Sequence, residues 1–384
     1  MSEIPFNRPF LAGSEMEFVR QAAAGRQLAN GGSFTARCEE WLSEATGAKR
    51  ALLATSATAG LEAAMMLAEL GPGDEVVMPS FAYPSIATAV LRQGGVPVFV
   101  DIDPDTLNLD PDRVQEAVGS RTKAIVAVHY GGISCDVDAL TEIAAARDLW
   151  IIEDAAHGLL AADRGRPLGA IGDLGVFSFH ETKNVTCGEG GALLVNRPAL
   201  IERAETIWEK GTDRAHFLRG DLDRYSWVDI GSSFGASEIS AAFLWGQLLA
   251  AEEVTATRRE IWDRYNEGLA GIEAEGLARR PRVALGHRHN GHLYYLILPT
   301  PGSRDAFIED LRRRGIATSF HYVPLHSAPA GRRFGRTAGE MTHTDQLSSR
   351  LVRLPLWPDL DDEQIERVID ACRSAAIRAA ATGA

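Results

Sequence analysis

The stretch Trp150-Ile-Ile-Glu-Asp154 is a short apolar run that favours a strand and ends in two acids. Six similar runs occur in the first two-thirds of the chain, separated by helix-like stretches such as 59–70, 111–118 and 137–147. Strands that alternate with helices predict an α/β fold, a mostly parallel sheet with helices on both faces. The predicted strands are Ala51–Ala54, Glu75–Met78, Val96–Val100, Ala124–Val128, Trp150–Glu153, Gly175–Phe179 and Ala192–Val195.

The last third of the chain has a different pattern. A long helical pattern covers roughly Ser237 to Leu269 and is expected to join two domains. A smaller α+β unit follows, with predicted strands at 293–298 and 318–322 and predicted helices at 304–314 and 363–379. At 384 residues the chain is too long for one simple core. We predict an N-terminal arm and large domain over residues 1–250 and a small domain over residues 251–384.

Composition excludes several classes of function. The net charge of −13 argues against a nucleic-acid or anionic-membrane partner, because both require a basic surface. No apolar run is long enough to span a membrane, and the first residues lack a signal-peptide pattern. The widely spaced cysteines indicate reduced thiols and a cytoplasmic location, with neither a disulfide framework nor a zinc site. They are Cys38, Cys135, Cys187 and Cys372.

The segment Ser178-Phe-His-Glu-Thr-Lys-Asn184 contains one of only four lysines among 39 basic residues. Arginine stays protonated, whereas lysine can lose its proton and attack a carbonyl. A glycine-rich stretch, Thr186-Cys-Gly-Glu-Gly-Gly191, follows and would let the backbone approach a flat ligand. Lys183 is therefore a candidate to form a Schiff base with the aldehyde of pyridoxal phosphate. The alternative is an ordinary surface lysine.

Asp154 lies at the end of its predicted strand, and together with Lys183 it indicates a cofactor site. A carboxylate beside the pyridine nitrogen of the cofactor favours the protonated ring, because opposite charges stabilise each other. Alone, the same residue would more simply cap a following helix. His157 could hydrogen-bond the phenolic oxygen of the cofactor, or be a helix-face histidine with a backbone partner.

Two further strand ends carry candidate ligands of the cofactor. The turn Thr55-Ser-Ala-Thr-Ala-Gly60 places hydroxyls and free N–H groups at a predicted helix N-terminus, which suits a phosphate. Tyr83, in Pro79-Ser-Phe-Ala-Tyr-Pro84, could stack on an aromatic ring, with buried core packing as the alternative.

Two charged groups invite other interpretations. His287, His289 and His292 lack a nearby acidic ligand and precede a strand, so a donor-rich loop is favoured over a metal site. A basic cluster comes earlier, and it could bind a diphosphate or consist of solvated surface charges. Its members are Lys210, Arg214, Arg219 and Arg224.

Taken together, these residues resemble the DegT/DnrJ/EryC1/StrS family of pyridoxal-phosphate sugar aminotransferases, nearly end to end. The matching blocks are Phe179-His-Glu-Thr-Lys-Asn184, Gly188-Glu-Gly-Gly191, Lys210-Gly-Thr212, Tyr225-Ser-Trp-Val-Asp-Ile-Gly-Ser-Ser233, Leu244-Trp-Gly-Gln247 and His321-Tyr-Val-Pro-Leu-His326. The resemblance implies fold type I, a homodimer with shared active sites, and transfer of an amino group from L-glutamate to C4 of a dTDP-4-keto-6-deoxy sugar.

The resemblance also implies roles for individual residues. Lys183 would bind the cofactor covalently, with Asp154 at the pyridine nitrogen, His157 near the phenolic oxygen and Tyr83 on the ring. The phosphate positions fall on Ser56, Ala57, Thr58 and Ser178, joined by Ser233 of the neighbouring subunit. The substrate positions fall on Lys210, Arg214, Arg219, His321 and Tyr322.

The chain departs from the family pattern in two places. Ser56-Ala-Thr58 replaces a Ser-Gly-Thr phosphate turn, and Gly231-Ser-Ser233 replaces a Gly-Tyr-Asn segment. The alternatives within the family are a C3 aminotransferase and a sugar dehydratase, although the dehydratase branch carries His where this chain has Lys183. A non-catalytic nucleotide-sugar sensor is the alternative from another class.

Overall fold

The large sheet contains all seven strands predicted from the apolar runs. A computed structural model of the protein describes residues 3–382. An eighth, two-residue strand from the last third of the chain completes the sheet. In spatial order the strands are β1 (Arg50–Ala54), β9 (Gly191–Val195), β8 (Leu174–Ser178), β5 (Trp150–Asp154), β4 (Thr122–Val128), β2 (Glu75–Pro79), β3 (Val96–Val100) and β12 (Arg336–Thr337).

Strand directions confirm the predicted α/β class. Only β9 runs against its neighbours, and the other pairs in the sheet are parallel. The parallel register aligns Val128 at the end of β4 with Asp154 at the end of β5. The carboxyl ends of the strands therefore meet at one edge, where ligands of such sheets bind.

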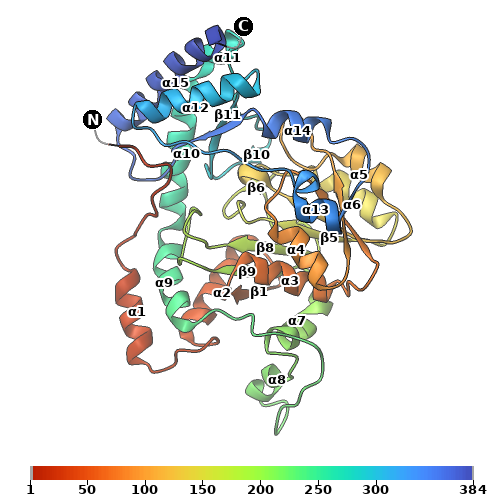
Figure 1. Ribbon diagram of the computed structural model, residues 1–384. Helices are drawn as coiled ribbons and strands as arrows, with labels where there is room; N and C mark the ends of the chain where they lie inside the picture. The colour runs from red at the N-terminus through yellow and green to blue at the C-terminus, as the bar shows by residue number, and fades with distance from the viewer. Residues whose placement is uncertain (1–2, 383–384) are drawn as a thin grey trace.

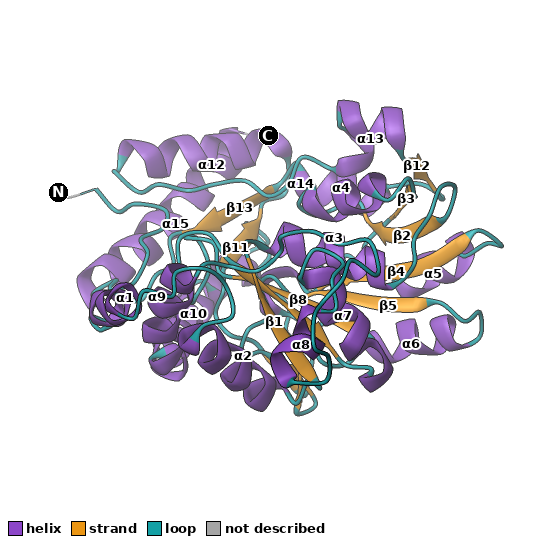
Figure 2. Ribbon diagram, turned by 90° about the horizontal axis from the view of Figure 1, so that it is seen from below, coloured by secondary structure: helices purple, strands orange, loops and turns teal. Residues whose placement is uncertain are grey.

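Helices cover both faces of the sheet, as Figures 1 and 2 show. Three of them pack on one face through a buried aliphatic core, and they are α3 (Ala57–Leu67), α4 (Ser85–Arg92) and α7 (Ile201–Trp208). Four pack on the other face: α2 (Ser33–Thr46), α5 (Pro111–Ala117), α6 (Val137–Ala145) and α9 (Glu238–Leu249). Helix α3 begins two residues before the prediction, because the Ser56 side chain caps it.

A second core lies above the sheet, at the end of the molecule that carries both termini (Figure 1). Helix α10 (Ala251–Gly268) follows α9 directly, and together they fill the predicted helical stretch. The elements around this core are α11 (Ala270–Ala274), β11 (Tyr294–Ile297), α12 (Pro301–Arg313), β13 (Leu351–Leu354) and α15 (Asp362–Thr382). Ile4, from the N-terminal arm, is also buried there. The domain boundary at residue 250 stays a prediction.

The strand predicted at 318–322 is wrong. Only Ser319 makes a β-bridge, to Arg353, and the remainder of that segment is loop. The partner of β11 is instead β13, which pairs with it from Tyr294↔Leu354 to Ile297↔Leu351. Three short strands form a separate small sheet: β6 (Ala162–Asp163), β7 (Arg166–Pro167) and β10 (His287–Arg288).

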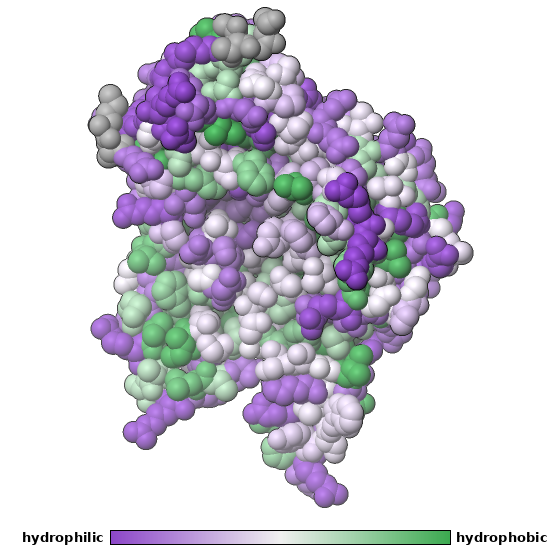
Figure 3. Space-filling view, viewed as in Figure 1, coloured by the Kyte–Doolittle hydropathy of each residue, from purple (hydrophilic) through white to green (hydrophobic). Residues whose placement is uncertain are grey.

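One segment projects from the body of the molecule. It contains α8 (Arg214–Arg219) and the loop after it, and it stands out at the lower edge in Figure 3. Several of its apolar side chains are exposed, with Trp227 at 78%. The remaining helices are α1 (Glu15–Ala24), beside α9, and α13 (Pro329–Phe334) and α14 (Thr342–Ser348). Within residues 3–382, no helix is both long and apolar enough to cross a membrane.

Candidate active site

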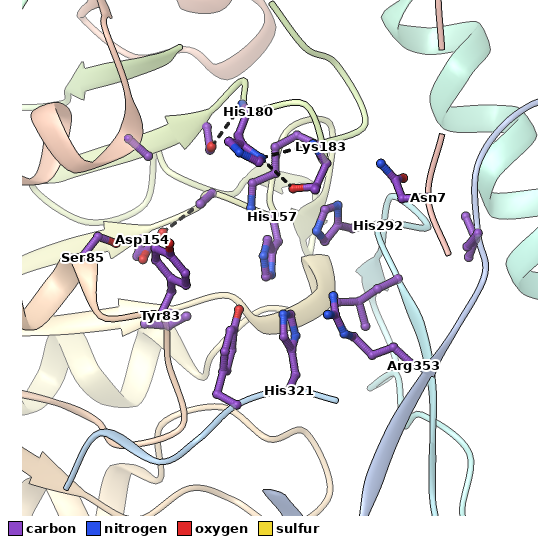
Figure 4. A pocket seen from close by; sticks show the side chains of 18 of the residues that line it. Asn7, Tyr83, Ser85, Asp154, His157, His180, Lys183, His292, His321 and Arg353 are labelled. Atoms are coloured by element: carbon purple, nitrogen blue, oxygen red, sulfur yellow. Dashed lines mark hydrogen bonds between the residues drawn. The ribbon is translucent and has the colours of Figure 1, made fainter. Parts of the chain in front are cut away.

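A cavity of about 440 Å³ lies where the carboxyl ends of the sheet strands meet the second core. Figure 4 shows side chains from both parts converging on it. Most of the predicted site residues line this one cavity, and they are Ser56, Ala57, Thr58, Tyr83, Asp154, His157, Ser178, Lys183, His321 and Tyr322.

Lys183 lies in the turn between β8 and β9, where its N–H donates to the His180 carbonyl at 2.9 Å. Burial lowers the pKa of its amine from 10.5 to about 8. The charge of Arg353 lowers this pKa further, while Asp154 opposes the change. Lys183 also lines the cavity and is only partly exposed, which distinguishes it from an ordinary surface lysine. The fold instead holds an amine that can lose its proton near neutral pH.

The two acids at the end of β5 have opposite environments. Glu153 accepts the Nε2–H of His129 at 2.8 Å, and three backbone N–H groups complete its shell: Gly169, Ile171 and Gly172, at 2.8, 2.7 and 2.6 Å. Burial alone would raise the pKa of Glu153, but these donors outweigh it and hold the pKa below its ordinary value.

Asp154 points to the cavity side of the sheet and keeps free acceptor capacity. Among the described residues its carboxylate accepts one hydrogen bond, from the Ala156 N–H at 3.1 Å. A turn follows it, so it caps no helix. Burial raises the pKa of this carboxyl, and the Ala156 bond and the Lys183 charge oppose the rise. A cation placed beside Asp154 would favour its ionised form.

His157 lies in a turn and not on a helix, and it has a backbone partner as the second interpretation expected. Its Nδ1 accepts the Gly131 N–H at 3.2 Å, so the proton of the neutral ring is on Nε2. The ring stacks on His292 with a centroid separation of 4.1 Å. Burial holds the pKa of His157 well below its ordinary value, and the charge of Lys183 acts in the same direction. His157 is therefore a neutral hydrogen-bond donor that lines the cavity.

The turn from β1 to α3 lines one end of the cavity with backbone donors and hydroxyls. Ser56 Oγ accepts the Ala59 N–H at 3.1 Å, while the first-turn N–H groups of Ala57 and Thr58 have no intrahelical acceptor. Strand β9 passes close behind, since a Cβ on Gly191 would lie 2.5 Å from the Ala57 nitrogen. The backbone donors at this turn suit a phosphate group.

Tyr83 lies in the loop before α4 and lines the cavity with 63% of its surface exposed. Buried core packing, the alternative interpretation, is therefore excluded. Its predicted place on the cofactor ring stays a prediction.

Four predicted site residues do not reach the cavity of their own chain. Ser233 is exposed and bridges Glu209 in the projecting segment. The predicted substrate cations pair locally with acids: Lys210 and Arg214 with Glu209, and Arg219 with Glu205 and Asp221. Within one chain these three cations are ion-paired charges at the surface.

The three histidines of the donor-rich loop go to separate places. His287 pairs with Asp163 at 3.0 Å, the ring of His289 lies tilted against Trp262, and of the three only His292 lines the cavity. Nowhere in residues 3–382 do three or more His, Cys, Asp or Glu side chains gather as a metal site.

Sequence reasoning missed several residues that line the cavity. They are Phe6 and Asn7 of the N-terminal arm, Arg258 on α10, His292, and Arg353 on β13. No local motif marks them, because each is brought to the site by packing of the second core. The one available signal was the apolar-polar pattern Leu351-Val-Arg-Leu354, in which a single cation interrupts a strand.

A model of the DegT/DnrJ/EryC1/StrS aminotransferase family matches residues 10–373. The chain belongs to this family. The solved aminotransferase TlmJ from Streptoalloteichus hindustanus is 32% identical over 98% of this chain and 99% of its own, with a TM-score of 0.89. DesI, solved in the presence of its TDP-sugar product, is 32% identical over 98% and 94% of the two chains, with a TM-score of 0.88.

The protein Spr1654 from Streptococcus pneumoniae was solved in its PMP form and also in its PLP form. In the PMP form it is 27% identical over 98% of this chain and 100% of its own, with a TM-score of 0.90. The fold is fold type I, and the protein is a sugar aminotransferase that depends on pyridoxal phosphate.

The polar groups that line the cavity match those that pyridoxal phosphate requires. A buried amine with a lowered pKa, a carboxylate with free acceptor capacity and a helix N-terminus line the same space. We infer that Lys183 would hold the aldehyde carbon, Asp154 the pyridine nitrogen and His157 the phenolic oxygen. The turn at Ser56–Thr58, together with Ser178, would hold the phosphate.

Proposed function

We propose that the protein transfers the amino group of L-glutamate to C4 of dTDP-4-dehydro-6-deoxy-D-glucose. The products are a dTDP-4-amino-4,6-dideoxyhexose and 2-oxoglutarate. The buried amine of Lys183 beside Asp154 carries the amine-transfer part of this proposal. The likeness to DesI, which was solved with a TDP-sugar product, supports the nucleotide-sugar part. The sequence blocks also resemble those of dTDP-4-amino-4,6-dideoxygalactose transaminase.

Bound pyridoxal phosphate supplies an aldehyde that carries the amino group and a ring that delocalises the electron pair left on the donor carbon. Once displaced, the Lys183 amine takes a proton from the α-carbon of the donor, and in the second half it delivers a proton to C4 of the sugar. Proton transfer by a positioned group contributes about 10²- to 10⁴-fold. Asp154 would hold the protonated pyridine nitrogen, and His157 would donate a hydrogen bond to the phenolic oxygen.

We also propose a homodimer with shared active sites in the cytoplasm. The projecting segment carries exposed Trp227 and Ser233 but lies away from its own cavity. In a second copy, Ser233 would join the cofactor phosphate, and Lys210, Arg214 and Arg219 would meet the diphosphate of the substrate. Four free cysteines support the cytoplasmic location. Sedimentation should give a dimer, and W227D should give an inactive monomer.

The test of the activity is incubation with L-glutamate and dTDP-4-dehydro-6-deoxy-D-glucose. Mass spectrometry should find the amino sugar, and NMR should place the amine on C4 and report a gluco or galacto configuration. An amine on C3 would support the C3 aminotransferase alternative, and loss of a hydroxyl without amine gain would support the dehydratase. A colourless protein that binds the sugar without turnover would support the sensor.

A further inference from the structure

A second pocket lies outside the active-site cavity. Its volume is about 470 Å³, and among the described residues it shares no lining residue with the active-site cavity. Helix α10, the segment after α11 and strand β10 form its walls. The proposed reaction uses none of its side chains. Those with a cationic or aromatic group outside the histidines are Arg259, Trp262, Arg280, Arg282 and Arg288.

The pocket is basic, although the protein carries a net charge of −13. Among the described residues that line it there are four arginines and a single acid, Glu273. The Glu273 carboxylate already pairs with Arg280 at 2.8 Å and lies 3.5 Å from a guanidinium nitrogen of Arg282. It therefore offsets only part of the positive charge around the pocket.

The other two arginines, Arg259 and Arg288, form no ion pair with any acid of residues 3–382. The Nε of Arg259 is buried and has no hydrogen-bond partner, whereas Arg288 is exposed at the rim. The charge of Arg259 opposes a rise that burial causes in the pKa of Asp263, but Asp263 does not line the pocket. A buried donor without a partner is costly, and a bound acceptor removes that cost.

His289 adds a neutral donor to the same wall. Its side chain is buried, with 8% exposed, and its Nδ1 accepts the Gly291 N–H at 3.1 Å. The proton of the neutral ring is therefore on Nε2, and this N–H has no partner among the described residues. Burial lowers the pKa of His289 to about 4, and the charge of Arg259 acts in the same direction. The ring of Trp262, 4.2 Å away, packs against the imidazole and holds it in place.

These groups select the chemical class of a ligand. Two unpaired guanidinium groups and one N–H donor favour an anion with more than one negative charge and several acceptor oxygens. A phosphate monoester carries a charge of about −1.5 to −2 at pH 7 and has three such oxygens. Arginine binds phosphate through short, charge-assisted hydrogen bonds. A single carboxylate would balance only one of the two cations.

We propose that this pocket binds the phosphate group of a small molecule through Arg259, Arg288 and the Nε2–H of His289. The site is separate from the turn at Ser56–Thr58 that we assign to the cofactor phosphate. The inference is independent of the proposed function, because it rests only on the residues of this pocket.

The experiment is calorimetric titration of the holoenzyme with inorganic phosphate in a phosphate-free buffer. We expect R259Q to bind phosphate about 10- to 100-fold more weakly than the wild type, because charge-assisted hydrogen bonds from a partly buried group are lost. R288Q should weaken binding less, by about 3- to 10-fold, because its charge is exposed and screened. R332Q is the matched control, since it removes the same charge from an exposed arginine of α13 outside both cavities. It should bind phosphate within about twofold of the wild type.

Other ligands test the chemical class. Acetate, with one charge and two oxygens, should bind about tenfold more weakly than phosphate at equal ionic strength. Glycerol 3-phosphate and AMP should also bind in an Arg259-dependent manner, and the tighter of the two indicates what the phosphate is attached to.

Three results would overturn the inference. They are the absence of phosphate binding in the wild type, equal phosphate affinity in R259Q and wild type, and acetate binding as tight as that of phosphate. If R259Q does not fold, as judged by its melting temperature, the comparison of R288Q with R332Q decides.

Discussion

Glu153 and Asp154 are neighbours in the chain, yet one carboxylate is fully hydrogen-bonded inside the fold and the other lines the cavity. Glu153 faces the side of the sheet covered by α5 and α6, where four donors satisfy it. Asp154 faces the cavity, and within the described chain its carboxylate accepts one hydrogen bond, from the Ala156 N–H. A buried carboxylate whose partners are complete serves the fold, whereas one with spare acceptor capacity is available to a ligand.

The largest effect is expected from a substitution of Lys183, whose amine lines the cavity together with Asp154. K183R keeps a positive charge but cannot lose its proton, so we expect amino-sugar formation to fall below detection. Borohydride reduction of the wild-type holoenzyme should leave the cofactor on the peptide that contains Lys183. A label on another lysine, or full activity of K183R, would contradict the proposal that Lys183 in the cavity binds the cofactor.

D154N should separate chemistry from folding. The amide can still accept the Ala156 N–H, so the melting temperature should stay within a few degrees of the wild type. Turnover should fall by about 10²- to 10³-fold, because a fixed charge beside the reacting system is lost. Steady-state kinetics and a thermal melt measure the two effects. A large loss of stability with normal turnover would break the distinction between the two acids.

E153Q should show the opposite behaviour. The new amide would turn an N–H donor toward His129 Nε2–H and the Gly169 N–H, which are donors themselves. We expect the free energy of unfolding to fall by about 3 kcal/mol, since buried donors lose their partners. Denaturant unfolding measures this loss. Turnover per folded molecule at low temperature should remain near that of the wild type, and a catalytic defect without destabilisation would contradict this.

The smallest effect concerns pH. The neutral amine of Lys183 attacks the aldehyde, and its pKa is about 8, so only the fraction deprotonated at a given pH reacts. Capture of pyridoxal phosphate by the apoenzyme should therefore accelerate about tenfold per pH unit below 8 and level off above it. Stopped-flow absorbance follows the capture. A rate that keeps rising to pH 10 would indicate an amine with an ordinary pKa.

The sheet and its half of the site were predictable because they depend on local patterns. Apolar runs marked the strands, and their carboxyl ends placed Ser56, Tyr83 and Asp154 in one cavity before any geometry was known. Lys183 was identifiable by its chemistry and scarcity. Glu153, one residue from Asp154, gave no sign of its role, since its donors come from turns that only the folded sheet brings near.

The other half of the site depends on long-range packing. Arg353 reaches the cavity because β13 pairs with β11, and the sequence analysis predicted no strand at 351–354. Ser233 and the basic cluster were predicted from family likeness, and their own chain keeps them away from its cavity. Their proposed roles would require a second copy, which no local pattern in one chain describes.

The N-terminal arm has a practical consequence for anyone who prepares the protein. Ile4 is buried in the second core, Trp357 Nε1 donates to the Pro5 carbonyl at 3.2 Å, and Phe6 and Asn7 form part of the cavity wall. Removal of the first eight residues to improve crystals would delete the Phe6 ring that packs against Arg353, and it would expose the cavity to solvent on that side. Expression plasmids should keep these residues intact.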